Sequence, residues 1–470
     1  MKILGVSASL RNRRFAYKNE LVEDIKKVQS LEGIKSFVND QIKITFEEIK
    51  NLNKGLSFDQ NYKKLKKFKG NRGLSNSEAS LVYALWQANS NGVDIDYLSL
   101  SNIFKNENKS KLSFFKKKFL ECDALLISGP VYFGDRGSLT QRMIEFINSD
   151  KKCINHIKKI FYAGLAVGAK RNGGQETTLI FQMTDFLNMG AKVVGNGHDT
   201  TSQYGGTLVA GDIGKVQDDD YGIRTSLSTG DNLSKCLKDF KESIKVNKDE
   251  KIDKKSETKI CNVFVMQDNE EEECTKIISS FIKNNKKTNV KFNIFKVFKE
   301  KVYRCIACDL CPTSYGNKED YRCIINNKDD FFKLYHNEII NCDSFIFAAY
   351  SGENYFNIQS NYQQFIERTR YLRRDDYAMG SKLVTSFIVS EVNSNRNLHI
   401  RTLTSLIRHK NILSKPLLVF KNQNSYINID SVKREFKNFI NNIEYLKSRK
   451  EENTYVPIGY EISYKGFLKR

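Results

Sequence analysis

Four cysteines in the second half of the chain have the spacing of ligands to one inorganic centre: Cys305, Cys308, Cys311 and Cys323. Their C-x2-C-x2-C-x11-C pattern places soft thiolate ligands on one loop, which selects zinc or iron–sulfur over magnesium or calcium. Compact C-x2-C-x2-C runs are typical of cubane clusters, so we favour iron–sulfur over zinc. Idle buried thiols are a third interpretation, which the density of cysteines in this stretch disfavours.

A second set of residues, in the first part of the chain, suits a phosphate group. Ser7, Ser9 and Arg11 follow a short apolar segment with the character of a strand, and Asn76 and Ser77 open a later helix. Hydroxyls, backbone N–H groups and a helix N-terminus can hold a phosphate dianion. The chain has no G-x-G-x-x-G and no Walker lysine motif, which disfavours dinucleotide-binding and P-loop folds.

Glycine-containing loops later in the same half suit a flat ring system. Pro130, Tyr132 and Phe133, in SGPVYFGDRGSLTQRM, offer a rigid turn with aromatic surface. Gly173 and Gly174, in VGAKRNGGQETTL, let backbone amides approach ring oxygens and nitrogens. A further segment, SQYGGTLVAGD, adds a tyrosine beside flexible glycines.

The elements that must position these loops are short apolar segments alternating with helical periodicity, which predict βαβ units and parallel sheets. The pattern FLECDALLISGPVYF around Cys122 recurs as IINCDSFIFAAYSGE around Cys342. We therefore predict two tandem α/β domains, 1–240 and 259–470, joined by a charged linker over 241–258. Ligands of such sheets bind at the carboxyl ends of the strands.

A lysine-rich insertion over about residues 15–70 interrupts the first domain. Ser75 and Glu78 form a capping-box pattern, which predicts that the helix expected after the first strand begins there. Within the insertion, NELVEDIKKVQSL and FEEIKNLNKGL have helical periodicity. The insertion is either a lid or partner-binding arm over the site or a pair of helices with no role in it.

Over about residues 1–240 the sequence resembles the flavodoxin-like NAD(P)H-dependent FMN reductase and quinone reductase superfamily. SASLR, GPVYFGDRGSLTQRMIEFI, GGQETTL and QYGGTLVAGDIG carry the resemblance, in the family's order. It implies a doubly wound sheet of five parallel strands, non-covalently bound FMN and NAD(P)H as co-substrate. It places Ser7, Ser9, Arg11, Asn76 and Ser77 at the phosphate, and Pro130, Val131, Tyr132, Phe133, Gly134, Gly173, Gly174, Gln175 and Tyr204 around the isoalloxazine.

The second domain keeps the strand pattern but not the flavin loops. QDNEEEEC stands where the first domain has SASLR, and NSNRNLHI replaces the glycine pair, so we expect a degenerate domain without flavin. Its cysteines resemble those of iron–sulfur flavoproteins, which implies a [4Fe–4S] cluster. The gap before Cys323 is longer than usual in that family, so Cys342 is a second candidate for the fourth ligand, although its match to Cys122 favours a packing role.

These features predict an FMN-dependent oxidoreductase in which an iron–sulfur cluster relays electrons to a small-molecule or protein acceptor. No side chain is expected to act as a catalytic nucleophile. The alternative is a non-catalytic assembly or sensing module of the same fold with a structural zinc site. The tandem domains suggest an intramolecular pseudo-dimer, and a homo-oligomer stays open.

Composition and motifs argue against several other classes. The net charge of +21 invites nucleic-acid binding, but no nucleic-acid motif accompanies it and lysine is abundant throughout, so we favour a solvated basic surface. No apolar run is long enough to cross a bilayer, so we expect no membrane span. Ten cysteines in a chain of this length fit a reducing compartment, which indicates the cytoplasm.

One basic stretch has two interpretations. ERTRYLRRDDY, from Glu367 to Tyr377, carries four arginines. Bidentate arginine contacts could recognise an anionic substrate or a nicotinamide 2′-phosphate. We favour a solvated helix face.

Overall fold

A computed structural model of the chain describes residues 1–446 except 11–19, 54, 68–72, 198–202, 212–214, 250–257, 267–268, 286–287, 309–310, 312–322, 353–354, 374–376 and 395–396. The chain divides into two compact units, Met1–Leu237 (unit 1) and Lys238–Arg470 (unit 2). None of the described helices combines the length and apolar character that crossing a bilayer requires.

Unit 1 is built on a parallel sheet of buried strands. The strands are β1 (Lys2–Ser7), β2 (Asp94–Ser99), β3 (Ala124–Tyr132), β5 (Phe161–Gly168), β6 (Lys192–Val193) and β7 (Gly206–Val209). Their order is β2–β1–β3–β5, and β6 and β7 share the fifth position, pairing with the first and last residues of β5. Because both faces of such a sheet are covered, its strands are almost continuously buried.

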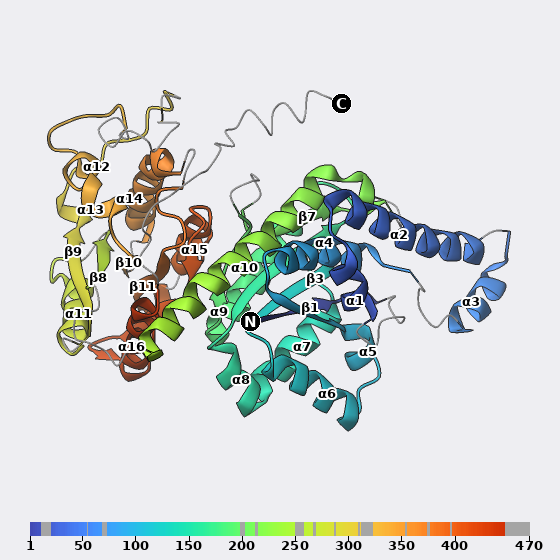
Figure 1. Ribbon diagram of the computed structural model, residues 1–470. Coiled ribbons are helices and arrows are strands. Elements are labelled where there is room, and N and C mark those ends of the chain that lie inside the picture. The colour runs from blue at the N-terminus through green and yellow to red at the C-terminus, as the bar shows by residue number, and fades with distance from the viewer. Residues whose placement is uncertain are drawn as a thin grey trace. The chain divides into compact units, whose positions relative to one another are not determined.

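The helices of unit 1 cover both faces of this sheet. They are α4 (Asn76–Ser90), α5 (Leu100–Phe104), α6 (Lys109–Leu120), α7 (Ser138–Ser149), α8 (Lys151–Ile157), α9 (Gln175–Met189) and α10 (Asp220–Asp249), with a 3-10 turn η1 (Val216–Asp218). In Figure 1, α4 and α10 lie on one side of the sheet and α6, α7 and α8 on the other. The first part of the predicted linker over 241–258 is helical, since α10 runs to Asp249, and 250–257 lie outside the described residues.

The insertion in unit 1 is helical, as its periodicity predicts. It contains α1 (Glu20–Lys27), α2 (Leu31–Asn53) and α3 (Phe58–Lys67), and α2 and α3 project away from the sheet (Figure 1). On α2, Thr45 donates a hydrogen bond to the carbonyl of Leu74 at 2.8 Å. A β-carbon on Gly73 would stand 2.0 Å from the carbonyl oxygen of Gln41, so only glycine allows this approach. The insertion is therefore anchored directly before α4.

Unit 2 repeats the architecture. Its strands are β8 (Lys259–Val265), β9 (Val290–Lys296), β10 (Ser344–Ser351), β11 (Leu383–Glu391), β12 (Ile412–Leu413), β13 (Leu417–Asn422) and β14 (Ser425–Tyr426). They follow the order β9–β8–β10–β11, with β12 and β13 sharing the fifth position and β14 antiparallel to β13. The predicted fold class, α/β with parallel, doubly wound sheets, is confirmed.

Six helices and three 3-10 turns cover the described part of unit 2. They are α11 (Glu273–Lys283), α12 (Phe331–Leu334), α13 (His336–Ile340), α14 (Tyr355–Arg368), α15 (Leu398–Ile407) and α16 (Ile429–Glu444), with η2 (Val297–Lys299), η3 (Thr369–Leu372) and η4 (Val392–Ser394). Between the sheet and α12–α14 lies a cluster of phenylalanines, in which Phe264 contacts Phe331, Phe345, Phe347 and Phe365. This aromatic cluster forms the core of unit 2 on that face of the sheet.

Candidate functional site

The carboxyl ends of β1, β2 and β3 bring three serines side by side. Ser7, Ser99 and Ser128 occupy matching positions on neighbouring strands. The chain bends directly after β1, where the amide of Ala8 donates to the carbonyl of Ser128 at 2.8 Å and the amide of Ser9 to Ser7 Oγ at 3.4 Å. Ser7 and Ser9 therefore lie at the sheet edge where ligands of such folds bind.

The first turns of α4 are tied to this edge. Ser80 Oγ lies 2.6 Å from Ser128 Oγ. Asn76 and Ser77 form the first turn, and the side-chain oxygen of Asn76 is buried without a hydrogen-bond partner in the described part of the chain. Turning that amide over presents its nitrogen as a donor to an anion. Arg11, the remaining predicted phosphate residue, lies outside the described residues.

The buried carboxyl group of Glu78 takes part in capping the N-terminus of α4. The predicted capping box is confirmed, since Ser75 accepts from the amide of Glu78 and the Glu78 carboxylate accepts from the amide of Ser75 at 3.0 Å. Tyr97 donates its hydroxyl proton to the other carboxylate oxygen. Glu78 is 1% exposed, and burial raises its pKa from 4.5 to about 7 despite these bonds. The sequence indicates the cap but not this burial.

The predicted ring loop after β3 is a tight hairpin. The pairing of Val131 with Arg136 leaves Phe133 and Gly134 as a two-residue turn, with φ angles of 52° and 79°. Two positive φ angles are characteristic of a type I′ turn, which normally favours Asn, Asp or Gly at the first position. Phe133 is fully exposed at the tip and Tyr132 is half exposed beside it. A strained, exposed aromatic residue at a site edge suggests a binding role.

The hairpin meets the glycine pair that precedes α9. Gly174 caps α9 with a φ of 97°, and a β-carbon there would stand 2.7 Å from the α-carbon of Gly134 and 3.2 Å from a methyl group of Val131. A β-carbon on Gly173 would stand 2.7 Å from the carbonyl oxygen of Lys170. The structure thus brings the two predicted ring loops into contact, and glycine is what permits it.

Two side chains hold the loop after β5 in place. Gln175 donates to the carbonyls of Lys170 and Leu208, at 2.7 and 3.2 Å, while its own oxygen is buried and unpartnered among the described residues. Arg171 donates to the carbonyl of Thr207 at 3.0 Å and pairs with Asp219. Sequence reasoning missed the pairing of Arg171 with Asp219, because nothing in their spacing links them.

Tyr204 takes a different place from the other predicted ring residues. It precedes β7, at the amino end of that strand, whereas the ring loops follow the carboxyl ends of β3 and β5. The neighbouring Gly205 presses against β5, since a β-carbon there would stand 2.2 Å from the carbonyl oxygen of Gly164. A contact of Tyr204 with the ring stays a prediction.

The predicted cysteine ligands all lie in unit 2, directly after β9 and η2. Cys305, Cys308, Cys311 and Cys323 are half-buried, and among the described residues no three His, Cys, Asp or Glu side chains are grouped as metal ligands. The donor set still suits a soft metal or cluster, because all four groups are thiols from one segment. Cys342 is buried, donates to the carbonyl of Ile339, and has its pKa raised by burial.

The ligand edge of unit 2 is filled by its own side chains. Glu273, the first residue of α11, pairs with Lys421 at 2.8 Å and accepts a hydrogen bond from Tyr426. Lys421 and Tyr426 come from the hairpin of β13 and β14. By topology α11 of unit 2 corresponds to α4 of unit 1. Both helices carry a carboxyl group in the first turn, but Glu273 on α11 pairs with a lysine, whereas among the described residues Glu78 on α4 does not.

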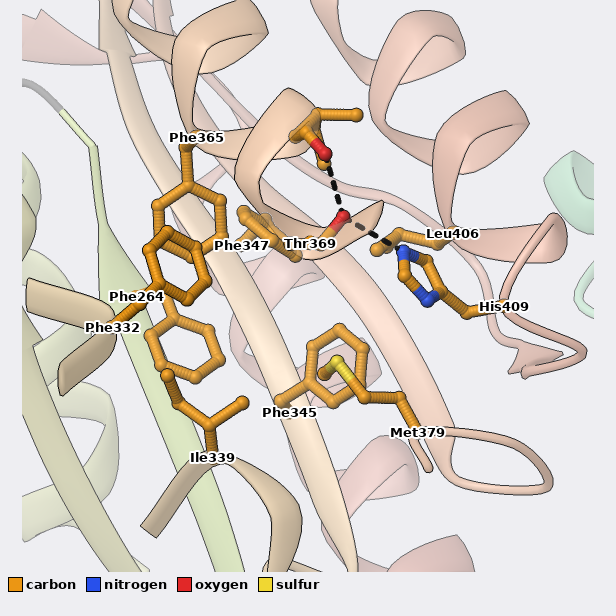
Figure 2. A pocket seen from close by; sticks show the side chains of 11 residues that line it. Phe264, Phe332, Ile339, Phe345, Phe347, Phe365, Thr369, Met379, Leu406 and His409 are labelled. Atoms are coloured by element: carbon orange, nitrogen blue, oxygen red, sulfur yellow. Dashed lines mark hydrogen bonds between the residues drawn. The ribbon is translucent and has the colours of Figure 1, made fainter. Parts of the chain in front are cut away.

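A pocket in unit 2 belongs to the core and not to a polar ligand site. Figure 2 shows its wall of phenylalanines with His409 and Thr369 as the polar members. Thr369 donates to the carbonyl of Ile366 at 2.7 Å, so the proton between Thr369 and His409 Nε2, 3.0 Å apart, belongs to the histidine. Burial lowers the pKa of His409 from 6.5 to about 3, which keeps the ring neutral.

Comparison with known proteins gives one relative of substantial identity. An iron–sulfur flavoprotein of Methanocaldococcus jannaschii is 30% identical over 165 residues, which cover 32% of this chain and 84% of that protein. No family model matches the chain. Among solved structures, a flavone reductase is 14% identical, with a TM-score of 0.30 over 51% of this chain and 64% of that one. RosB with a bound 8-demethyl-8-formylriboflavin-5'-phosphate intermediate is 12% identical, with a TM-score of 0.30 over 54% and 88%.

Proposed function

The chain belongs to the iron–sulfur flavoprotein family, and on this basis we propose that it is an FMN-dependent oxidoreductase whose flavin binds at the carboxyl edge of unit 1. The observation that carries the proposal is the contact of Gly134 with Gly174, because it joins the β3 hairpin and the N-terminus of α9 into one continuous wall. Glycine has no β-carbon, so main chain at such positions can approach a ligand closely.

The residues of this edge divide into two groups. Ser7, Ser9 and Asn76 would hold the phosphate, with the α4 N-terminus contributing backbone donors and a favourable dipole. The main chain from 130 to 134 and from 173 to 175 would hold the ring. When bound, FMN supplies hydride and single-electron chemistry, and the protein supplies position and electrostatics. Below about pH 7 Glu78 is largely neutral and adds little repulsion toward a phosphate.

The exposed aromatic side chains give this edge a surface for an acceptor. Phe133 and Tyr132 stand at the hairpin tip beside the proposed ring position. A quinone or another flat acceptor would gain from stacking on them. We propose NAD(P)H as the hydride donor and a small molecule or protein as the acceptor.

The segment over 304–329, which carries the four predicted ligands and is called the cysteine segment below, would add a second redox centre. Cys305, Cys308, Cys311 and Cys323 would hold a [4Fe–4S] cluster that relays electrons. The filled edge of unit 2, with Glu273 bonded to Lys421, supports a division of roles in which unit 1 holds the flavin and unit 2 the cluster.

The test is an anaerobic absorption spectrum of the purified full chain, with FMN, iron, sulfide and zinc measured on the same sample. We expect flavin and cluster bands, with iron and sulfide in equal amounts. Cys308→Ser should lose the iron and keep FMN, whereas Cys274→Ser, at a buried cysteine outside the segment, should keep both. Zinc without iron would favour the structural-zinc module, and a chain that cannot be reconstituted with FMN would contradict the flavin site.

A further inference from the structure

Two side chains of α14 hold the main chain that leads into the cysteine segment. Gln364 donates to the carbonyl of Val302, and Arg368 Nη1 donates to the carbonyl of Tyr303 at 3.0 Å. Gln364 and Arg368 are spaced i, i+4 on the helix and therefore lie on one face. Because Cys305 follows shortly after Tyr303, the first predicted ligand starts from a fixed point.

Asp330 holds the other end of the segment at the same place. Its carboxylate accepts from the Tyr303 amide at 3.2 Å and from both Nη atoms of Arg368 at 3.0 and 2.9 Å. An isolated parallel bridge also joins Lys301 to Asp330. Cys323 precedes Asp330 along the chain. The ion pair of Arg368 and Asp330 therefore joins a residue before the first cysteine ligand, Tyr303, to a residue after the last one.

The ion pair between Arg368 and Asp330 is fully buried, and removing two charges from water costs free energy that can exceed their mutual attraction. The side chains of Arg368 and Asp330 are both 0% exposed. Arg368 lies 5.2 Å from the ring of Phe332, within the aromatic cluster, and its Nε has no partner among the residues described. Apolar residues often replace such pairs without loss of stability. They could not bond the amide and carbonyl of Tyr303, as the carboxylate and the guanidinium do.

This arrangement corrects the interpretation of the stretch from Glu367 to Tyr377. A solvated helix face is wrong for Arg368, which is among the largest fully buried side chains. Its guanidinium contacts protein groups at the base of the cysteine segment. A soluble anionic substrate therefore does not account for it.

We propose that Arg368 and Asp330 are positioning residues, which hold the ends of segment 304–329 together and so prepare its cysteines for their inorganic centre. The inference rests on the proposed function in one respect, that these cysteines are ligands. With the ends already joined, a metal centre need not close the whole loop on binding. Mutation of residues that support metal ligands typically lowers metal affinity about 10–100-fold.

The experiment compares three variants of the full chain with the wild type. In Arg368→Met/Asp330→Leu both charges are removed together, which leaves no unpaired buried charge. Arg368→Lys keeps the charge but lacks the fork that reaches two acceptors. The control, Lys415→Met/Glu435→Leu, removes an ion pair of unit 2 that lies outside the cysteine segment. Bound FMN, thermal unfolding and the rate of metal release to a chelator are measured, with release followed by the cluster's visible absorption.

We expect the first double variant to fold, to keep FMN and to release its metal at least about tenfold faster than the wild type. Arg368→Lys should fall between the two, and the control should match the wild type. A folded double variant that keeps its metal as long as the wild type overturns the proposal; if that variant does not fold, unaltered retention in Arg368→Lys does so. If the wild type holds zinc, the iron–sulfur cluster is contradicted, and the rates of zinc release from the same variants test the positioning role.

Discussion

Gly134 and Gly174 approach each other so closely that a β-carbon on Gly174 would stand 2.7 Å from the α-carbon of Gly134. Both residues have positive φ angles, 79° and 97°. Two loops that follow different strands therefore meet through main chain alone.

Replacing Gly173 and Gly174 together by valine should abolish FMN binding while unit 1 stays folded. The new β-carbons would meet backbone atoms, and the left-handed conformation of Gly174 disfavours any branched residue. FMN is measured by equilibrium titration and folding by circular dichroism. Gly55→Ala is the matched control, because Gly55 has a φ of 65° and nothing within 4 Å, so it tests strain alone. Stoichiometric FMN on the folded valine variant would remove these loops from the site.

The full chain should bind one FMN and not two. In unit 2 the end of α11 is occupied by Glu273, which Lys421 and Tyr426 hold in place. FMN released by denaturation, divided by protein from amino-acid analysis, gives the ratio. The double valine variant at Gly173 and Gly174 should then retain none, and retention of half the flavin would reveal a second site.

Unit 1 should lose stability as the pH rises through Glu78's titration. The carboxyl has a pKa of about 7 in the folded chain against 4.5 ordinarily, so the folded state holds its proton while the unfolded state releases it. Between pH 4.5 and 7 the free energy of unfolding should therefore fall, by about 3 kcal/mol in total. Trp86, the single tryptophan and itself on α4, reports this by fluorescence in denaturant. Glu78→Gln should flatten that part of the profile; an unchanged slope would contradict the assignment.

Unit 2 should show the opposite pH dependence through His409. The pKa of His409 is about 3 in the folded chain against 6.5 ordinarily. Between pH 6.5 and 3 the ring is therefore protonated in the unfolded state and neutral in the folded state. Stability should therefore fall as the pH drops from 6.5 toward 3. Hydrogen exchange of α15, followed by mass spectrometry, measures this in the full chain. His409→Leu should reduce the acid sensitivity, and exchange that depends on pH as in the wild type would exclude His409 as its source.

The sequence predicts features that depend on local pattern. The buried strands, the capping box at Ser75 and Glu78, and the gathering of the loops after β1, β3 and β5 all follow from alternation, caps and the geometry of parallel sheets. The fifth strand was harder to specify, because β6 and β12 are two residues long and carry little periodic signal.

Pairings between distant residues could not be predicted from local pattern. Arg368 occurs in a basic stretch whose composition favours solvent, and only the fold reveals that Asp330 faces it. The same holds for Arg171, in the loop after β5, and Asp219, which directly precedes α10. Such contacts depend on packing of segments far apart in the chain, and no spacing rule encodes them.

The anchored insertion before α4 also has a consequence for biosynthesis. β1 leaves the ribosome before its partners β2 and β3, which begin only at Asp94 and Ala124, after α1, α2 and α3. At ordinary elongation rates of about 5–20 residues per second, the apolar strand waits on the order of 5–20 seconds for its first neighbour. The helices of the insertion can form within that interval. The insertion thus lengthens the time for which a nascent chain exposes an unpaired central strand.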